Sequence, residues 1–548
     1  MKISNINSQY NFKGATININ ALADTHGHIE YADAAYQTLM KEDAFEKERR
    51  GTANYLITGG DWFMSGDKKG YKSAPDKPLV DFQTDMYNKF VGTIKKNFPK
   101  LKALFIPGNH EFDGGMETFK STVDKIDSTV IMSNIETETS SALEKEITDG
   151  HIVKSTIDFV QDDKKNDVYY PVLNIGISPV NMRYYKSDIS GIDFINNIPL
   201  AQKKVHPSQY SSTTSKIHDM VKDFRNKYDN GIVVLTSHTG VDFAQTIAQQ
   251  GGIDIIFNAH EHKNEVENVN GVPIINLSQN FAKVVNTKIN INDDGKISDI
   301  KCKDLYPKKE CFKTESEIGK FYEDLFKEDS KKIYTIKCSD PNITEFGTEG
   351  IRKGPSLLAN FVTDILLEEA KEHDPNIDIF ALNASAIRGG FNVGGNEPNT
   401  TNVQVLNCLD GITSSHGEIF VTDVTGEELA MMLTDNFLFN MIDREKNPMI
   451  HYSGIAVDRT GLLAAYHNGS DFKDLCKYIS STYTGFDINP EKKYRIANPL
   501  KYFEKAQIEQ IKEMKSKSQS LHCEIHELFN DYFKKHNVIT YTPEERLF

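Results

Sequence analysis

Short clusters of carboxylate, amide and imidazole side chains recur in the first half of this 548-residue sequence. The clusters are Asp24-Thr25-His26, Gly60-Asp61, Gly108-Asn109-His110-Glu111, Ser237-His238 and Ala259-His260-Glu261-His262. In an extended segment, residues two apart point to the same side. Asp24 and His26 can therefore present two donor atoms to one place, and so can the two imidazoles of the last cluster. Oxygen and imidazole donors without a thiolate favour hard or borderline divalent ions such as Mn, Zn, Fe or Co.

Each cluster comes at the end of a short apolar run, at residues 15–23, 53–58, 101–106, 232–235 and 253–257. The runs contain many β-branched residues and alternate little, which is typical of strands covered on both faces. Helix-like stretches lie between the runs, at 31–50 and 78–96, so the pattern predicts a layered α/β domain. Because ligands bind at the carboxyl ends of strands in open α/β sheets, we expect the five clusters to meet at one sheet edge. Further strands are predicted at 266–269, 272–277 and 284–291.

The second half of the chain opens with a charged segment and continues with a second apolar pattern. Residues 311–332 are rich in Glu and Lys at helical spacing, which predicts a connecting helix with a solvated charged face. The later elements predicted are a helix at 356–371, a strand at 377–382, a mostly helical stretch at 503–535 and a last strand at 539–541. We therefore expect a domain at 1–310, a helical connector at 311–340 and a second domain at 341–548.

The charge and the cysteine content argue against several kinds of protein. A formal net charge of −15 disfavours a surface that grips polymeric nucleic acid or an anionic membrane. It does not disfavour a small anionic substrate, because bound metal ions can reverse the local field. The six cysteines include no Cys-x-x-Cys pair, so neither a disulfide framework nor a thiolate zinc site is expected.

The sequence shows no signal for export or for membrane insertion. The N-terminus has no apolar run of the length that a secretory signal needs, and no stretch is apolar for long enough to cross a bilayer as a helix. The expected location is the cytoplasm if Met1 is the native start, and the periplasm or the exterior if it is not.

The ordered set of clusters resembles the calcineurin-like metallophosphoesterase superfamily. The superfamily pattern is Asp-x-His, Gly-Asp, Gly-Asn-His-(Asp/Glu), His and Gly-His-x-His, and it is complete here except that Ala259 replaces the usual Gly. The motif Gly-Asn-His-Glu-Phe-Asp at 108–113 and the segment Val-Ile-Met-Ser-Asn at 130–134 are similar to the 5′-nucleotidase branch. The resemblance implies an N-terminal four-layer α/β/β/α metallophosphoesterase domain and a C-terminal α/β substrate domain of the 5′-nucleotidase type.

The resemblance also implies the roles of individual residues around two divalent metal ions. One ion would be held by Asp24, His26 and His262, the other by Asn109, His238 and His260, with Asp61 bridging them. A metal-activated hydroxide would attack phosphorus in line. His110, paired with Asp113, would face the phosphate and donate a proton or a hydrogen bond. Glu111, His28 and Glu261 are expected beside the ligands rather than among them.

The resemblance to the 5′-nucleotidase family continues over most of residues 345–500. The segment Gly-Ile-Arg-Lys-Gly-Pro at 350–355 is similar to a family segment, and Asn-Ala-Ser-Ala-Ile-Arg at 383–388 is similar to the family motif Asn-x-Gly-x-Ile-Arg, with Ser385 in place of Gly. Segments 424–429 and 451–454 match two further family segments. The resemblance implies that Arg352 and Arg388 hold the substrate phosphate, for which a guanidinium offers a planar fork of donors. Asn383 would lie near the base or the ribose.

The expected base pocket departs from the family pattern. Residues 414–417, Ser-Ser-His-Gly, stand where the family has an aromatic residue, and no Gly-Gly-Asp follows residues 494–498. Tyr502 or Phe503 could supply the second stacking ring and His416 a weaker one, where each ring contributes about 1–3 kcal/mol. We therefore expect a small phosphate ester as the substrate, with nucleoside 5′-monophosphates first, and leave the preference for a base open.

Two other interpretations of the sequence remain open. The first is another reaction within the superfamily, either cyclic-nucleotide phosphodiester hydrolysis or nucleotide-sugar pyrophosphate hydrolysis. The second is a nucleotide-binding or sensor protein that kept the fold and lost turnover, although no metal ligand of the pattern is missing.

Overall fold

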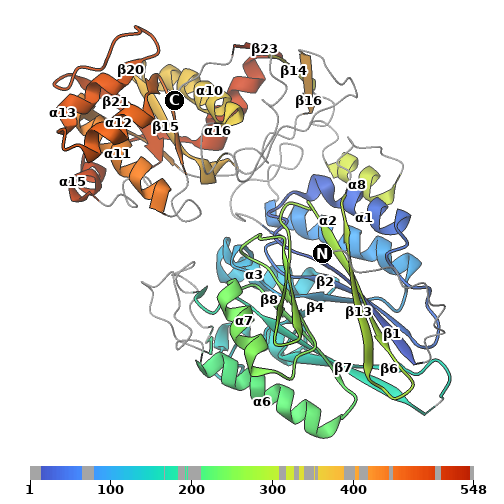
Figure 1. Ribbon diagram of the computed structural model, residues 1–548. Helices are drawn as coiled ribbons and strands as arrows, with labels where there is room; N and C mark the ends of the chain where they lie inside the picture. The colour runs from blue at the N-terminus through green and yellow to red at the C-terminus, as the bar shows by residue number, and fades with distance from the viewer. Residues whose placement is uncertain are drawn as a thin grey trace, which may run out of the picture. The chain divides into compact units, whose positions relative to one another are not determined.

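The structure is a computed structural model, and its described residues divide into two compact units, Met1–Phe326 and Lys327–Phe548. The described residues are 14–63, 79–165, 167–182, 192, 194–195, 211–307, 316–325, 333–338, 351, 356–387, 402–406, 418–442, 449–499 and 508–542. Figure 1 shows both units.

The first unit contains a seven-stranded sheet in the order β13-β12-β1-β2-β3-β4-β5. Its strands are β1 (Ala15–Leu22), β2 (Thr52–Thr58), β3 (Lys102–Phe105), β4 (Thr129–Ile131), β5 (Ile152–Val153), β12 (Val284–Ile291) and β13 (Ile297–Leu305). Strands β1 to β5 run parallel to one another, while β12 and β13 are antiparallel additions at one edge. The carboxyl ends of β1, β2 and β3 therefore lie side by side.

A second sheet of six strands has the order β10-β11-β9-β8-β7-β6. Its strands are β6 (Ser155–Gln161), β7 (Tyr169–Ile177), β8 (Ile232–Ser237), β9 (Ile255–Asn258), β10 (Val266–Val269) and β11 (Val272–Asn276). Strands β7, β8, β9 and β11 are mutually parallel. The carboxyl ends of β8 and β9, which precede two of the five clusters, are thus neighbours in this sheet.

The two sheets pack face to face, with helices on their outer faces (Figure 1). Between the sheets lies a core to which Ile17 and Tyr55 contribute from one sheet and Val234 and Phe257 from the other. Helices α6 (Ser211–Lys227) and α7 (Val241–Gln250) cover the second sheet. The first sheet is covered by helices that include α2 (Leu79–Asn97), whose Tyr87 ring lies 5.5 Å from that of Phe105. The predicted α/β/β/α layering is therefore confirmed.

The remaining elements of this unit are short. They are η1 (Ile29–Tyr31), α1 (Ala32–Lys41), η2 (His110–Phe112), α3 (Gly115–Lys125), η3 (Ser141–Leu143), α4 (Glu144–Thr148) and α8 (Glu317–Leu325). No helix among the described residues of either unit is long and apolar enough to cross a membrane.

Two predictions for the first unit were wrong in detail. The helix predicted at 31–50 ends at Lys41, because the chain then turns inward with Asp43 at φ 46°. The Ala44 carbonyl there accepts hydrogen bonds from three buried side-chain amides, those of Asn18, Asn20 and Asn286. The five clusters also lie at the edges of two sheets, not one, because the β6–β7 hairpin starts a second sheet after the third cluster.

Helix α8 lies inside the segment predicted as a connector and packs on the first unit. Its Glu317 carboxylate pairs with Lys89 and Lys96 of α2, and Ser316 donates a hydrogen bond to Asp33 of α1. Hydrogen bonds from the two lysines lower the pKa of Glu317 to about 2. Of the helix predicted at 311–332, residues 311–315 and 326–332 lie outside the described residues.

The second unit is built on a five-stranded sheet in the order β18-β15-β21-β17-β22. Its strands are β15 (Ile379–Asn383), β17 (Glu418–Thr425), β18 (Ile450–Ser453), β21 (Lys493–Pro499) and β22 (Gln519–Glu524). Helices α10 (Leu357–His373) and α16 (Ile525–Lys535) share a core with one face of the sheet. Helices α11 (Gly426–Ile442), α12 (Arg459–His467) and α13 (Phe472–Leu475) share a core with the other.

Smaller elements complete the described part of this unit. A three-stranded sheet has the order β16 (Asn402–Leu406), β14 (Ile333–Cys338) and β23 (Val538–Tyr541), and a two-stranded one joins β19 (Ile455–Val457) to β20 (Ile479–Ser481). The short helices are η6 (Ala384–Ala386), η8 (Cys476–Tyr478), α15 (Glu509–Glu513) and η9 (Met514–Lys517).

The helix predicted from residue 356 and the strand predicted at 539–541 are confirmed, and the Ser356 hydroxyl caps α10 by accepting from Ala359 N. The mostly helical stretch predicted at 503–535 is wrong at 519–524. There the chain forms the edge strand β22, because β17 offers it a partner that the local sequence does not contain.

Candidate metal centre

The loops after β1 and β2 continue the pairing of their strands. Backbone N–H groups of the first loop donate to carbonyls of the second: Asp24 to Gly60 at 2.9 Å, His26 to Asp61 at 2.8 Å and Gly27 to Trp62 at 2.9 Å. Because the pairing extends beyond the strand ends, the side chains of Asp24, His26 and Asp61 are held beside one another.

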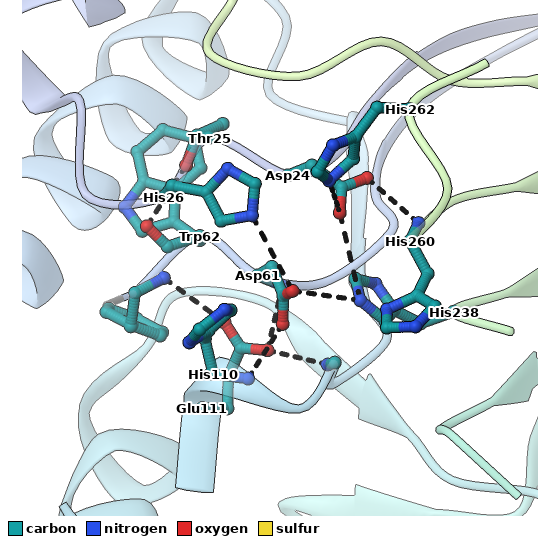
Figure 2. A network of polar contacts seen from close by, with 12 residues as sticks. Asp24, Thr25, His26, Asp61, Trp62, His110, Glu111, His238, His260 and His262 are labelled. Atoms are coloured by element: carbon teal, nitrogen blue, oxygen red, sulfur yellow. Dashed lines mark hydrogen bonds and ion pairs between the residues drawn. The ribbon is translucent and has the colours of Figure 1, made fainter. Parts of the chain in front are cut away.

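The loops of the second sheet reach the same place. His238 follows β8 and donates its N–H to Ile177 O of β7 at 2.8 Å, while Ala259 donates to Ser237 O at 2.9 Å. The N–H of His260 then donates to Asp24 Oδ2 at 3.1 Å, which ties the second sheet's edge to the first. The carboxyl ends of both sheets therefore face one centre (Figure 2).

The carboxylates and imidazoles of this centre form three overlapping groups (Figure 2). Within each group the potential ligand atoms lie within 4.8 Å of one another. The groups are Asp24, His26 and His262; His26, Asp61 and His110; and Asp61, His238 and His260. The first and third of these each hold three potential ligands for one cation, and Asp61 belongs to two groups.

The two carboxylate oxygens of Asp61 have different surroundings. Oδ1 accepts the backbone N–H of His110 at 2.8 Å. Oδ2 lies 3.0 Å from His238 Nε2 and 3.8 Å from His26 Nε2, and so faces the imidazoles of both outer groups. A single oxygen atom of Asp61 is thus placed where it could contact two cations.

Two of the rings are oriented by an oxygen behind them. His26 Nδ1 lies 3.1 Å from Asn280 Oδ1, and His238 Nδ1 lies 2.6 Å from the carbonyl oxygen of Gly59. Carbonyl oxygens only accept, so Nδ1 of each ring is the donor and Nε2 is left facing Asp61. This is the tautomer that a metal ligand bound through Nε2 requires.

Asn109 supplies a further indication of a cation. Its side chain is buried, and Oδ1 has no hydrogen-bond partner among the described residues. A buried acceptor without a partner costs about 1–3 kcal/mol. A divalent cation bound through this oxygen would remove that penalty, so the donor set fits two cations held by oxygen and imidazole.

The charges of the centre favour a cation as well. Burial opposes protonation of His238, but the carboxylates of Asp61 and Asp24 raise its pKa to about 10. Burial likewise opposes ionisation of Asp61, yet His238, His110 and His26 hold its pKa well below the usual value. Burial, with His238 next, lowers the pKa of His260 to about 3, which leaves that ring neutral and able to donate a lone pair.

His110 and Asp113 form a pair at the rim of the centre. His110 Nδ1 lies 2.8 Å from Asp113 Oδ2, so the carboxylate holds the ring from behind. The His110 side chain is 21% exposed, and its ring centroid lies 5.5 Å from that of His26. His110 is thus partly open to solvent beside the ligand groups.

Left-handed backbone conformation is concentrated in this centre. Positive φ values occur at Asp24 (50°), His26 (50°), Asp61 (50°), His260 (80°) and His262 (56°). Such conformations cost about 1–3 kcal/mol each and collect at functional sites. Ala259 is not among the described residues with positive φ, so the missing Gly causes no strain there.

Two glycines of the predicted motifs are required by close approach. A Cβ on Gly60, whose φ is 87°, would lie 2.5 Å from Gly108 N. A Cβ on Gly108 would lie 2.2 Å from Asp61 Oδ1. The Gly-Asp and Gly-Asn-His motifs therefore pack against each other.

The sequence did not indicate every residue that shapes the centre. Asn280, which accepts from His26, follows β11, far from any motif, and nothing in the sequence marks it. Glu111 was expected beside the ligands. Its carboxylate accepts hydrogen bonds from three backbone N–H groups, which belong to two loops.

Most of the residues predicted to bind substrate lie outside the described part of the chain. These are Arg352, Arg388, His416, Tyr502 and Phe503. Asn383 is described, and it ends β15, which runs parallel to the neighbouring strand β21. The buried amide of Asn498, near the end of β21, has no hydrogen-bond partner among the described residues. Both amides are thus at the carboxyl ends of adjacent strands, the usual place for a ligand in such a sheet.

Residues 17–264 match the model of the calcineurin-like phosphoesterase family, and this range contains all seven predicted metal ligands. A comparison with curated proteins gives no match.

Comparison with solved structures shows the same two-domain fold along nearly the whole chain. A 5′-nucleotidase precursor from Thermus thermophilus has a TM-score of 0.63 and 15% identity, over 97% of this chain and 99% of that one. A second structure, a putative 5′-nucleotidase from Staphylococcus aureus, has a TM-score of 0.53 and 14% identity, over 97% and 100%. The sulfate thiohydrolase of Thermus thermophilus has a TM-score of 0.56 and 13% identity, over 97% and 96%.

Proposed function

We propose that this chain, whose residues 17–264 form a calcineurin-like phosphoesterase domain, hydrolyses small phosphate esters with two divalent metal ions. We further propose nucleoside 5′-monophosphates as the first substrate class. The observation that carries the proposal is the placement of Asp61 Oδ2, which faces imidazoles of two ligand groups at 3.0 and 3.8 Å. A shared oxygen between two sets of ligands is the arrangement that a two-metal hydrolase needs.

The ligand residues form two sets, one for each ion, and one bridging residue. Asp24, His26 and His262 would hold one ion, Asn109, His238 and His260 the other, and Asp61 would bridge them. When bound, the two ions would lower the pKa of a water molecule and neutralise charge on the attacking and leaving oxygens.

The residues of the chain itself would orient the ester and handle the proton. His110, held through Nδ1 by Asp113, would direct its other ring nitrogen at the phosphate or the leaving oxygen. A histidine oriented by a carboxylate in this way can donate a hydrogen bond to the developing negative charge.

The second unit would contribute residues that bind the substrate. Its fold matches structures described as 5′-nucleotidases, which supports a nucleotide as substrate. We propose that Arg352 and Arg388 bind phosphate oxygens and that Asn383 lies near the base or ribose. We assign catalysis to residues 1–310 and substrate binding to residues 341–548, with 311–340 as the segment between them.

The test is a substrate panel with purified protein and Mn²⁺. The panel contains an aryl phosphate, AMP, UMP, UDP-glucose, a cyclic nucleotide and a sulfate ester, the last because a sulfate thiohydrolase shares the fold. We expect phosphate release from the aryl phosphate and the monophosphates, and none in EDTA. Faster turnover of UDP-glucose or the cyclic nucleotide would show that this compound, and not a nucleoside 5′-monophosphate, represents the substrate class. No release from any ester, with no metal found by elemental analysis, would contradict the enzyme assignment.

A further inference from the structure

Glu111 is a buried carboxylate with an unusual set of partners. Its Oε2 accepts the N–H of Asp61 at 2.8 Å and the N–H of Gly108 at 2.6 Å, and its Oε1 accepts the N–H of Phe63 at 3.2 Å. Asp61 and Phe63 belong to the loop after β2, whereas Gly108 belongs to the loop after β3. One side chain therefore joins two of the loops that form the metal centre (Figure 2).

The contact between Asp61 and the 110–111 segment is reciprocal. The Asp61 N–H donates to the Glu111 carboxylate, and the His110 N–H donates to Asp61 Oδ1 at 2.8 Å. The first bond fixes the backbone of Asp61 and the second fixes the rotation of its carboxylate. Oδ2 is then the oxygen left to face His26 and His238.

The backbone of this loop needs such a partner. Asp61 has a φ of 50° and Gly60 a φ of 87°, so the turn is held in a conformation that L residues rarely adopt. Because Asp61 is buried, its N–H would lose its acceptor without Glu111, and an unpaired buried donor is unfavourable.

We propose that Glu111 is a positioning residue for the metal bridge: its carboxylate holds the loops of Asp61 and Asn109 so that Asp61 Oδ2 faces both ligand groups. This proposal depends on the two-metal function proposed above. A carboxylate is required because all the named partners are donors, and a carboxylate has only acceptors. A glutamine would turn an amide N–H₂ toward at least one backbone N–H.

The chain offers a matched control in Glu261. This residue also directly follows a histidine of the centre, but its carboxylate pairs with Lys263 at 3.0 Å and its side chain is 33% exposed. Glu111→Gln and Glu261→Gln thus remove the same charge at the same sequence position relative to a histidine, with and without the loop contacts.

The experiment measures Mn²⁺ binding to wild type, Glu111→Gln, Glu111→Asp and Glu261→Gln by calorimetry and elemental analysis. We expect Glu111→Gln to raise the Mn²⁺ Kd by about 10–100-fold. Glu261→Gln should bind like wild type, and Glu111→Asp should fall between. With an aryl phosphate as substrate, Glu111→Gln should need more Mn²⁺ for half-maximal rate, with KM changed little at saturating Mn²⁺.

Thermal unfolding in EDTA separates positioning from simple support of the fold. If Glu111→Gln lowers Tm but keeps the wild-type Mn²⁺ Kd, the proposal is overturned. If Glu111→Gln does not fold, Glu111→Asp decides, and a wild-type Kd in that variant overturns the proposal.

The outcome for wild type distinguishes this proposal from the proposed function. If wild type binds Mn²⁺ but hydrolyses no ester, the proposed function fails, and the Glu111 proposal is still decided by the Mn²⁺ affinities. If wild type binds no Mn²⁺, both fail.

Discussion

The two outer ligand groups of the metal centre are built in different ways. In the group of Asp24, His26 and His262, all three residues have left-handed backbone, and His26 is oriented by the side chain of Asn280. In the group of Asp61, His238 and His260, the fully buried His238 is oriented by the backbone carbonyl of Gly59. The N–H of His238 also continues the strand pairing through Ile177 O.

This difference indicates that the His26 ring depends on a loop side chain, whereas His238 depends on backbone atoms at strand ends. The first group can be weakened through one neighbouring side chain, such as Asn280. The ring of His238 offers no such side chain, because a backbone carbonyl orients it. The first group should therefore be the easier one to perturb and the one that exchanges its cation faster.

The largest effect should come from substitution of Asp61, which faces both outer ligand groups. Asp61→Asn should lower kcat for an aryl phosphate by several orders of magnitude and reduce the metal content, because its Oδ2 faces both groups. Steady-state kinetics and elemental analysis would measure this. Turnover near wild type would remove Asp61 from the bridge.

Substitution of His110 tests the part of the centre near the first ligand group, because the rings of His110 and His26 are neighbours. His110→Ala should lower kcat by about 10²–10⁴-fold while both cations remain bound, because the residue would act on the ester and not on the ions. Asp113→Asn should have a smaller effect in the same direction, since it would change only how the ring is held. Loss of a cation in His110→Ala would make this histidine a ligand instead.

Substitution of Asn280 tests whether the two outer ligand groups are independent. Asn280→Ala should weaken one Mn²⁺ by about 10–100-fold and leave the other unchanged, because its Oδ1 contacts only His26 of the ligands. Calorimetric titration with Mn²⁺ would resolve the two steps. Gln279→Ala, at the neighbouring residue, is the control and should match wild type. Equal weakening of both ions in Asn280→Ala would show that the groups are not independent.

The smallest effect concerns stability in EDTA. His262→Gly should change the free energy of unfolding by no more than about 1 kcal/mol, because relief of the φ of 56° offsets the loss of the 3.1 Å contact between His262 Nε2 and Asp24 Oδ1. His238→Gly should destabilise, since that residue is fully buried and its ring bonds to Gly59 O. Urea unfolding would measure both, and an equally large loss in His262→Gly would contradict the comparison.

The residue types and spacing of the motifs were sufficient to predict most of the centre. Asp24 and His26 fall in one ligand group, as predicted, although their backbone is left-handed and not extended. His260 and His262 were expected to point to one place, but they fall in different groups. The layered α/β fold follows from strands without alternation and from the helices between them. These features are encoded within a few residues of where they appear.

What the sequence did not reveal depends on partners far along the chain. Nothing near Asn280 indicates that His26, 254 residues away, will need an acceptor. The early end of α1 depends on Asn18 and Asn286 reaching Ala44 O. The strand β22 exists because β17 has a free edge, although its own sequence is also compatible with a helix.

The docking of α8 has a practical consequence for dividing the chain into fragments. Ile318 and Tyr322 of α8 are buried, and Glu317 is fastened to α2 by two lysines. A fragment that stops at residue 310 would lack this helix. The apolar surface of α2 that the helix covers would then be exposed and prone to aggregation. A fragment that runs to residue 326 keeps this surface covered, and we expect this version of the first unit to be soluble when it is expressed by itself.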